Sequence, residues 1–387
     1  MRRLENVSCV WSRVSCFQAR HSIDHDWKRV ATFPRAPAFP ASLHPSHPYI
    51  VPPVNPALET LMLPFAAGEV PVPKSALFLG AEPHPDLKSW PLLTGWQPQK
   101  PLADAWDKAG FERAGETHSA WPLVLLLPGK SKEETLVLFA KAHDLLEMGG
   151  TLVVAMPNTA GAGRFEKELA AAAGGVTTFS KNKCRVFRAT KTSSWNAGTL
   201  TAWRALGEPR KIGGTEWTTR AGIFSPDHID PGSAFLVEHL PANLKGIAAD
   251  LGAGWGFLSK ALLETSPDLK AVHLFEADAQ ALDCARTNLA GSSVEAFFHW
   301  HDVATGLPGK YEVVVVNPPF HTGQNINISL GCRFLRSAAD ALRIGGKLFI
   351  VANRQLPYEA ELDRLGLVWR KVAENAAYKL LFADKRR

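Results

Sequence analysis

The residues best suited to chemistry form a short run, Asn317, Pro318, Pro319 and Phe320, directly after an apolar segment at 312–316. The Asn317 amide oxygen and the Pro318 carbonyl could each accept one N–H bond from an exocyclic amine, which would aim the nitrogen lone pair at an electrophile. Phe320 could stack on a flat base. A rigid turn would explain the prolines, but not a polar side chain beside an aromatic one. The run therefore predicts a site that activates an amine on a planar ring.

A glycine-rich turn precedes this run and suits a nucleotide-like cofactor. It follows an expected strand at 247–251, which contains Asp250, and it opens an expected helix at 257–264. Glycines let a backbone pass close beneath a ligand. The spacing is Gly-x-Gly-x-Gly rather than that of a dinucleotide fingerprint, because position 257 is Phe. The expected cofactor residues of this turn are Asp250, Gly252, Gly254 and Gly256.

Two further acids stand where the next strands should end. Glu276 closes an expected strand at 271–276, and its carboxylate could accept bonds from two ribose hydroxyls. Asp302 follows the apolar and aromatic residues 297–301 and could accept from an adenine amine. Each sign is weak alone, but together and in this order they favour a nucleotide-type cofactor. An amine activated by the 317–320 run could attack a sulfonium methyl group in line.

No metal site is predicted. His299 and His301 share one face of an expected strand, but no third ligand of clear spacing follows, so we interpret them as ordinary histidines. The histidines and aspartates of residues 21–26 lie in a segment without a scaffold to orient ligands. The 5 cysteines are scattered and form no Cys-x-x-Cys pair, which fits a reducing compartment.

Short apolar strands alternate with helical stretches in two successive series along the chain. This alternation predicts parallel β-α-β units. The first series comprises strands at 76–80, 123–127 and 150–155 with a helix at 132–148. The second comprises strands at 247–251, 312–316 and 346–351 with a helix at 327–342.

The two series form an internal repeat. Residues 148–152 match 344–348 at an offset of 196, and residues 185–189 match 379–383 at an offset of 194. Where the second half has the 317–320 run, the first has Leu-Pro-Gly-Lys, and Phe78 stands near the position of Asp250. We therefore predict an α/β fold of two tandem, doubly wound, Rossmann-like domains. The first is degenerate and acts as a scaffold or as a substrate-docking partner.

The predicted organisation has four parts: a disordered extension at 1–54, a degenerate domain at 55–191, a basic linker at 192–220 and a catalytic domain at 221–387. The first part lacks periodicity and is rich in proline. Because no run of about 18 apolar residues occurs and no secretory signal opens the chain, we expect a cytoplasmic protein without a membrane partner. A monomer is expected.

Positive charge is concentrated rather than spread. The formal net charge is +6, yet residues 181–220 alone contain 9 basic and 2 acidic residues. Such a segment would attract a polyanion, although a solvated surface is the alternative. We expect Lys181, Lys183 and Arg185 to contact nucleic acid.

The ordered set of Asp250, the glycine turn, Glu276, Asp302 and the 317–320 run resembles class I methyltransferases that act on planar nitrogens. Shorter matches resemble, more narrowly, the bacterial ribosomal RNA guanine-N2 methyltransferases. These matches are GIFS at 222–225, DPGS at 230–233, FHTG at 320–323, VAN at 351–353 and LPY at 356–358.

This resemblance covers residues 56–385. It implies two tandem methyltransferase domains with the first degenerate, S-adenosylmethionine as the cofactor, and guanine in ribosomal RNA of the small subunit as the substrate. It also implies that residues 222–225, including Phe224, lie over the cofactor and the target base, and that His321 lies at the substrate. The sequence departs from the family at Glu276, where aspartate is commoner, and in the unmatched residues 1–54.

Two alternatives remain open at this point. The chain could methylate a protein glutamine or an adenine, because the Asn-Pro-Pro-aromatic loop is shared among amine methyltransferases; many glutamine-modifying relatives carry tyrosine where this chain has Phe320. It could also be a non-catalytic RNA-binding assembly protein with a relic site. Against that reading, every expected polar group is present in the second half.

Overall fold

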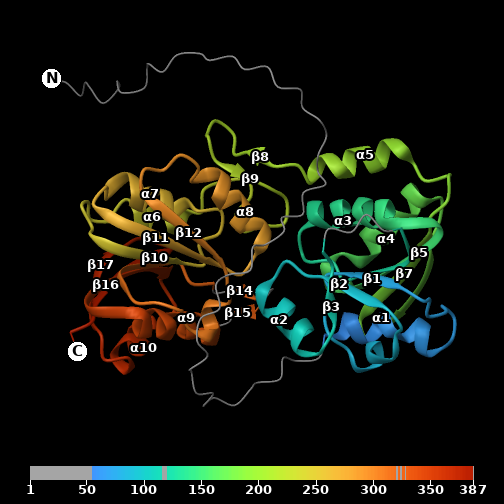
Figure 1. The fold of residues 1–387 in the computed structure, drawn as a ribbon, viewed down its shortest axis with the longest axis horizontal. Coiled ribbons are helices and arrows are strands. Elements are labelled where there is room, and N and C mark those ends of the chain that lie inside the picture. The colour runs from blue at the N-terminus through green and yellow to red at the C-terminus, as the bar shows by residue number, and fades with distance from the viewer. Residues whose placement is uncertain (1–54, 116–119, 320, 323–324, 327, 387) are drawn as a thin grey trace.

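The computed structural model describes residues 55–115, 120–319, 321–322, 325–326 and 328–386. It contains two seven-stranded sheets, each in its own lobe (Figure 1), with the same strand order. In each sheet only the strand at the sixth position runs antiparallel to the others. The predicted tandem Rossmann-like architecture is confirmed. The prediction of disorder at 1–54 lies outside the described residues.

The first sheet has the order β3-β2-β1-β4-β5-β7-β6. Its strands are β1 (Ala76–Leu79), β2 (Leu93–Trp96), β3 (Glu112–Arg113), β4 (Trp121–Leu126), β5 (Leu146–Pro157), β6 (Thr177–Lys181) and β7 (Cys184–Thr190). Its helices are α1 (Pro56–Ala66), α2 (Lys100–Lys108), α3 (Lys132–Leu145) and α4 (Ala162–Ala173), with 3-10 turns η1 (Pro85–Ser89) and η2 (Asn158–Ala160).

The second sheet has the order β12-β11-β10-β13-β16-β18-β17. Its strands are β10 (Gly246–Leu251), β11 (Leu269–Glu276), β12 (Glu295–Trp300), β13 (Tyr311–Val316), β16 (Leu342–Asn353), β17 (Val368–Glu374) and β18 (Tyr378–Asp384). Its helices are α6 (Pro231–Val237), α7 (Phe257–Thr265), α8 (Ala279–Asn288), α9 (Ile328–Ala341) and α10 (Tyr358–Arg364), with the 3-10 turn η3 (Val303–Thr305). A small hairpin pairs β14 (His321–Thr322) with β15 (Asn325–Ile326).

The repeat seen in the sequence is a repeat of strands. The strands β5 and β16 have the same length and are separated by 196 residues, and β7 and β18 are separated by 194. Three boundaries were predicted wrongly by three or four residues: the helix expected at 132–148 ends at Leu145, and the strands expected at 150–155 and 346–351 begin at Leu146 and Leu342. Leu146 already pairs with Trp121 in the sheet. Pairing with a distant strand therefore outweighs the local helical pattern of the last three residues.

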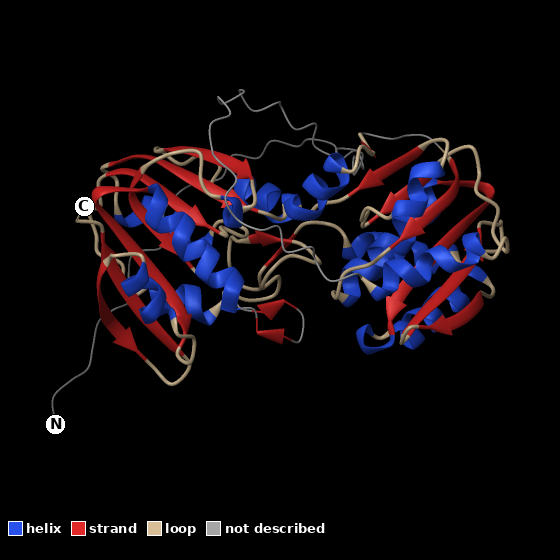
Figure 2. Cartoon of the chain, turned by 90° about the horizontal axis from the view of Figure 1, so that it is seen from below, coloured by secondary structure: helices blue, strands red, loops and turns tan. Residues whose placement is uncertain are grey.

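Apolar side chains fill both faces of each sheet, and Figure 2 shows helices covering those faces. The strand before the Asn-Pro-Pro run is a clear case, since Val314, Val315 and Val316 are each fully buried. Strands buried on both faces are typical of parallel sheets between helix layers. The polar residues that follow them emerge at the sheet edge.

The segment between the two domains is structured. Helix α5 (Ala197–Leu206) packs on α3, where its Trp203 contacts Phe139. The hairpin of β8 (Arg210–Lys211) and β9 (Thr218–Thr219) packs on the second domain, where the Thr218 amide donates to Asn288 Oδ1 at 2.7 Å. None of the described helices is long and apolar enough to cross a membrane.

The two domains meet through backbone as well as side chains. The Lys100 amide donates to the Ala277 carbonyl at 2.8 Å, and the Ala279 amide donates to the Pro98 carbonyl at 3.0 Å. The Trp300 indole N–H lies 2.9 Å from the same Pro98 carbonyl and 2.8 Å from that of Ala277. The first domain thus supports the loop that directly follows Glu276.

Candidate functional site

The glycine turn opens a space at the carboxyl edge of the second sheet. Gly252, Gly254 and Gly256 have φ of 74°, 54° and 90°, a region that glycine adopts without strain. A Cβ at Gly256 would stand 2.6 Å from Leu289 Cδ1, whereas one at Gly254 would meet nothing within 4 Å. Gly256 is therefore required for packing. Gly254 faces open space, where a ligand could lie against the backbone.

Asp250 is fully buried in β10 beneath this turn. Its Oδ2 accepts a bond from the Ser259 hydroxyl at 2.8 Å, and its Oδ1 has no partner among the described residues. Burial raises the pKa of Asp250 to about 7. An unpaired buried acceptor is costly, so a donor brought by a ligand would be favourable here.

Glu276 ties the turn to the end of β11. Its Oε2 accepts from the Gly254 amide at 2.7 Å, and its Oε1 accepts from the Asp278 amide at 2.8 Å. Burial is the main reason that the pKa of Glu276 rises to about 7. Each carboxylate oxygen can accept a second bond, so both backbone bonds are compatible with the predicted contact to ribose. The buried Asp250, the partly buried Glu276 and the open glycine turn thus fit S-adenosylmethionine.

Asp302 lies one strand further along the same edge, after β12. Its Oδ1 accepts from the Ala304 amide at 2.9 Å and so caps η3. The neighbouring histidines contact protein groups: His301 Nε2 lies 2.6 Å from the Gly306 carbonyl, and His299 Nε2 lies 2.9 Å from His273 Nδ1. No group of three possible metal ligands occurs in the described part of the chain.

Asn317 leaves β13 at the same edge, on the strand next to β10. Its Nδ2 donates to Asp230 Oδ2 at 2.8 Å and to Ser233 Oγ at 2.9 Å. Pro318 is buried directly after it. Phe320 lies outside the described residues. The structure therefore brings Asn317 to the same sheet edge as the cofactor turn.

Asp230 and Ser233 contact Asn317, yet from the sequence we predicted no role in the site for either residue. We noted them only as part of a motif shared with the related family. Asp230 caps α6 by accepting from the Ser233 amide at 2.7 Å, and Pro231 occupies the first turn. Asp-Pro-x-Ser is a recognisable helix start. That local signal locates the cap, but it does not reveal the partner 87 residues away.

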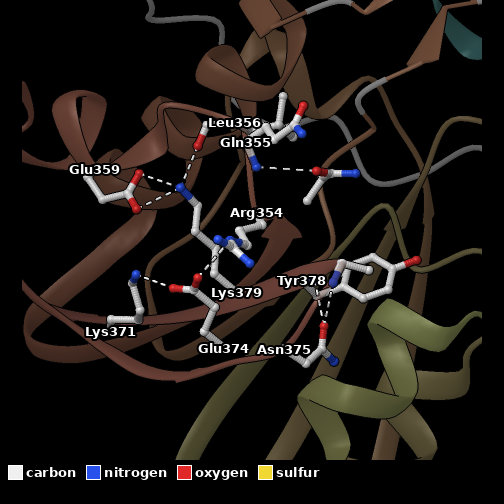
Figure 3. A network of polar contacts seen from close by, with 11 residues as sticks. Arg354, Gln355, Leu356, Glu359, Lys371, Glu374, Asn375, Tyr378 and Lys379 are labelled. Atoms are coloured by element: carbon white, nitrogen blue, oxygen red, sulfur yellow. Dashed lines mark hydrogen bonds and ion pairs between the residues drawn. The ribbon is translucent and has the colours of Figure 1, made fainter.

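A polar network further along the chain joins the start of β18 to α10 and to the β17–β18 turn (Figure 3). The buried Lys379 ammonium donates to both carboxylate oxygens of Glu359 at 2.6 Å and to the Leu356 carbonyl at 2.6 Å. Asn375 Oδ1 accepts from the Tyr378 amide at 2.7 Å, which shapes the turn between β17 and β18. These bonds place the residue pair Tyr378 and Lys379 firmly at the start of β18.

The loop at 222–225 lies between the domains. Phe224 is 61% exposed, and Ser225 has a φ of 47°. A Cβ at Gly222 would stand 2.6 Å from Glu134 Cδ, so this loop packs directly on a first-domain carboxyl group. His321 follows in the backbone of β14, paired with Ile326. The expected substrate contacts of Phe224 and His321 stay predictions.

The three expected RNA contacts lie around the β6–β7 hairpin of the first domain. Lys181 and Lys183 are exposed, and Lys183 has a φ of 57°. Arg185 instead forms an ion pair with Glu166. It occupies the repeat position of Lys379, which pairs with Glu359 in the second domain. The Arg185 charge is thus largely engaged within the protein.

The first domain repeats the strand arrangement around the candidate cofactor site but has different residues there. By strand register, Phe78 replaces Asp250, Gln97 replaces Glu276 and Glu82 replaces Gly254. Gln97 still accepts from a backbone amide two residues on, as Glu276 does. Glu82 accepts a bond from Asn55 Nδ2 at 2.9 Å. A side chain thus lies where the second domain has an open glycine.

The comparisons with known proteins agree with this geometry. Residues 214–382 match the methyltransferase small domain family. Proteins named ribosomal RNA small subunit methyltransferase C from Yersinia pestis (strain Pestoides F) and Yersinia pseudotuberculosis (serotype O:1b) are each 31% identical over 273 residues, which cover 70% of this chain and 77% of theirs. The solved T. thermophilus 16S rRNA N2-guanine methyltransferase RsmC, in complex with AdoMet and guanosine, is 26% identical, with a TM-score of 0.73 and coverage of 86% of this chain and 92% of that one.

The strand order, the glycine turn with its two acids and the Asn-Pro-Pro loop define a class I methyltransferase, an enzyme that uses S-adenosylmethionine as its methyl donor. The chain belongs to the ribosomal RNA small subunit methyltransferase C family.

Proposed function

We propose that this enzyme methylates the exocyclic N2 amine of a guanine in 16S ribosomal RNA of the small subunit. The observation that carries the proposal is the position of the Asn317 amide, which β13 delivers to the sheet edge beside the cofactor turn of β10. The names and the shared fold of the relatives support the choice of guanine and of 16S RNA.

The residues of the site explain how such a transfer would proceed. When bound, S-adenosylmethionine supplies an electrophilic methyl group to the guanine nitrogen, with loss of the carbon–sulfur bond to the departing sulfur. Asp250, Gly254 and Glu276 hold that donor at the carboxyl edge of the sheet. The Asn317 oxygen and the Pro318 carbonyl accept the two amine hydrogens, so that the nitrogen lone pair is available and aimed. The amine proton becomes acidic on methylation and passes to solvent.

The two tandem domains differ in the residues at the candidate site, which supports different roles for them. In the first domain Leu127 replaces Asn317 and Glu82 fills the position of Gly254, so we infer that only the second domain is catalytic. The exposed Lys181 and Lys183 support a role for the first domain in holding RNA.

Mass spectrometry of ribosomal RNA tests this proposal. RNA from a strain lacking the gene should lose one N2-methylguanine in 16S RNA, and the purified enzyme should restore it with labelled S-adenosylmethionine. Intact small subunits and naked 16S RNA should be supplied side by side to find the natural form of the substrate. Label in adenine, or in a protein glutamine, with no change in guanine would overturn the assignment.

A further inference from the structure

The Asn317 amide is held in a defined orientation. Both of its hydrogens are directed at acceptors at the start of α6, with Asp230 Oδ2 at 2.8 Å and Ser233 Oγ at 2.9 Å from Nδ2. The remaining polar atom of this amide is its oxygen, which can only accept. Rotation of the amide by 180° would instead place this oxygen against the Asp230 carboxylate, acceptor against acceptor.

From this geometry we infer that Asp230 and Ser233 are positioning residues that lock the Asn317 amide with its oxygen toward the substrate amine. The inference rests on the proposed function, because an amine substrate needs an acceptor at this point. A rotated amide would present its own N–H groups to the N–H groups of the base. The site would then lose an interaction with the reacting nitrogen although no atom had been removed.

The support for Asp230 continues into the fold. Asp230 is fixed as the cap of α6 through the Ser233 amide at 2.7 Å. Next to it, a Cβ at Gly232 would stand 2.9 Å from Tyr378 Cε1, so α6 lies directly against the Tyr378 ring. The Asn375 turn in turn holds the Tyr378 backbone (Figure 3). The position of the Asp230 carboxylate is therefore set by contacts that do not depend on substrate.

The first domain has a similar helix cap, but its capping side chain does not orient an amide in the position of Asn317. Helix α1 also begins with a cap and a proline, Asn55 and Pro56, but Asn55 bonds to Glu82. Leu127 replaces Asn317 and is buried. The cap alone is therefore a structural device of the repeat. Its use to orient an amide is confined to the domain that has Asn317.

Substitution of Asp230 tests the inference when binding and chemistry are measured separately. Asp230→Ala should lower kcat for methyl transfer by about 10- to 100-fold, the loss expected for a bond to a charged group. The KM for the small subunit and the Kd for S-adenosylmethionine should change by less than about threefold, since Asp230 contacts neither in this proposal. Asp230→Asn keeps an acceptor oxygen and should recover most of the kcat.

Further variants separate orientation from folding. Ser233→Ala removes one acceptor but leaves the cap of α6, and should lower kcat less than Asp230→Ala does. Asn317→Asp places two carboxylates together and should be inactive, whereas Asn317→Asp combined with Asp230→Asn restores a donor opposite an acceptor and should regain activity. Asp227→Ala is the matched control, because Asp227 is exposed on the same loop and pairs with Arg210.

Three results with these variants would each contradict the positioning role of Asp230. Wild-type kcat in Asp230→Ala, an Asp230→Asn variant as damaged as Asp230→Ala, or a rise in Kd that accounts for the whole loss would each overturn the positioning role. Failure of the proposed function is a separate result, seen with the wild-type enzyme as methylation of a substrate other than guanine. If that substrate is another amine, the same variants still test the orientation of Asn317.

Discussion

Replacement of Asn317 by alanine separates the chemistry from the architecture. The variant removes the acceptor proposed to contact the amine in the transition state, an interaction of the kind whose loss slows catalysis by about 10²- to 10³-fold. Asp230 loses one donor, but the Ser233 amide still bonds to it at 2.7 Å, so α6 should persist. The expected cost in unfolding free energy is about 1–2 kcal/mol.

The assay is single-turnover transfer of labelled methyl groups to small subunits, with the affinity for S-adenosylmethionine measured by calorimetry. The rate should fall by the stated factor while the Kd stays within about threefold, because the residues that we propose to hold the cofactor lie on β10, on β11 and in the turn after β10. Asn158→Ala, at an exposed position of the first domain, is the control. A single-turnover rate within about threefold of wild type would show that the Asn317 side chain does not act on the amine.

Three other predictions concern the cofactor, pH and RNA. Glu276→Ala should weaken S-adenosylmethionine binding by about 10- to 100-fold in calorimetry. Glu276→Gln keeps an acceptor oxygen, as Gln97 does in the first domain, and should lose less affinity. Equal affinities of the wild type and both variants would refute the role of Glu276. Burial raises the pKa of Glu134 to about 7, so the folded protein binds the proton of this carboxyl group more tightly than the unfolded chain does. The stability that the protonated Glu134 contributes to the folded protein is therefore lost as pH rises from about 4.5 to 7. In denaturant titrations, the free energy of unfolding of Glu134→Gln should therefore fall less between pH 5 and pH 8 than that of the wild type. The same fall in both proteins would contradict the raised pKa of Glu134. Charge reversal at Lys181 and Lys183 should weaken RNA binding and make its salt dependence shallower, whereas reversal at the exposed Lys270 should not; identical slopes would place the RNA path elsewhere.

Local pattern predicted the elements that carry the site. The run of valines before Asn317 indicated a strand buried on both faces, and three glycines indicated the turn between β10 and α7. Both follow from interactions within a few residues. The end of α3 was missed by three residues because pairing of Leu146 with Trp121, a long-range interaction, decides where the strand begins.

The first domain was predicted as inert, and the structure adds how its site is filled. Its lack of Asn317 and Asp250 counterparts is visible in the repeat. The presence of Glu82 where the second domain has Gly254, and the bond that Gln97 accepts from the Gln99 amide, depend on strand register and on side-chain direction. Neither the strand register nor the direction of a side chain can be predicted from the spacing of residues along the chain.

Residue type, period and order along the chain were enough to predict the class of fold and the internal repeat, and they led us to propose which residues offer acceptors to a cofactor and to an amine. The contact of Asp230 with Asn317, and the support that the first domain gives to the loop after Glu276, became visible in the folded structure alone. Those contacts join segments that are far apart in sequence, and their hydrogen-bond geometry exists only after both sheets have formed. The orientation of a single amide is therefore a property of the whole fold.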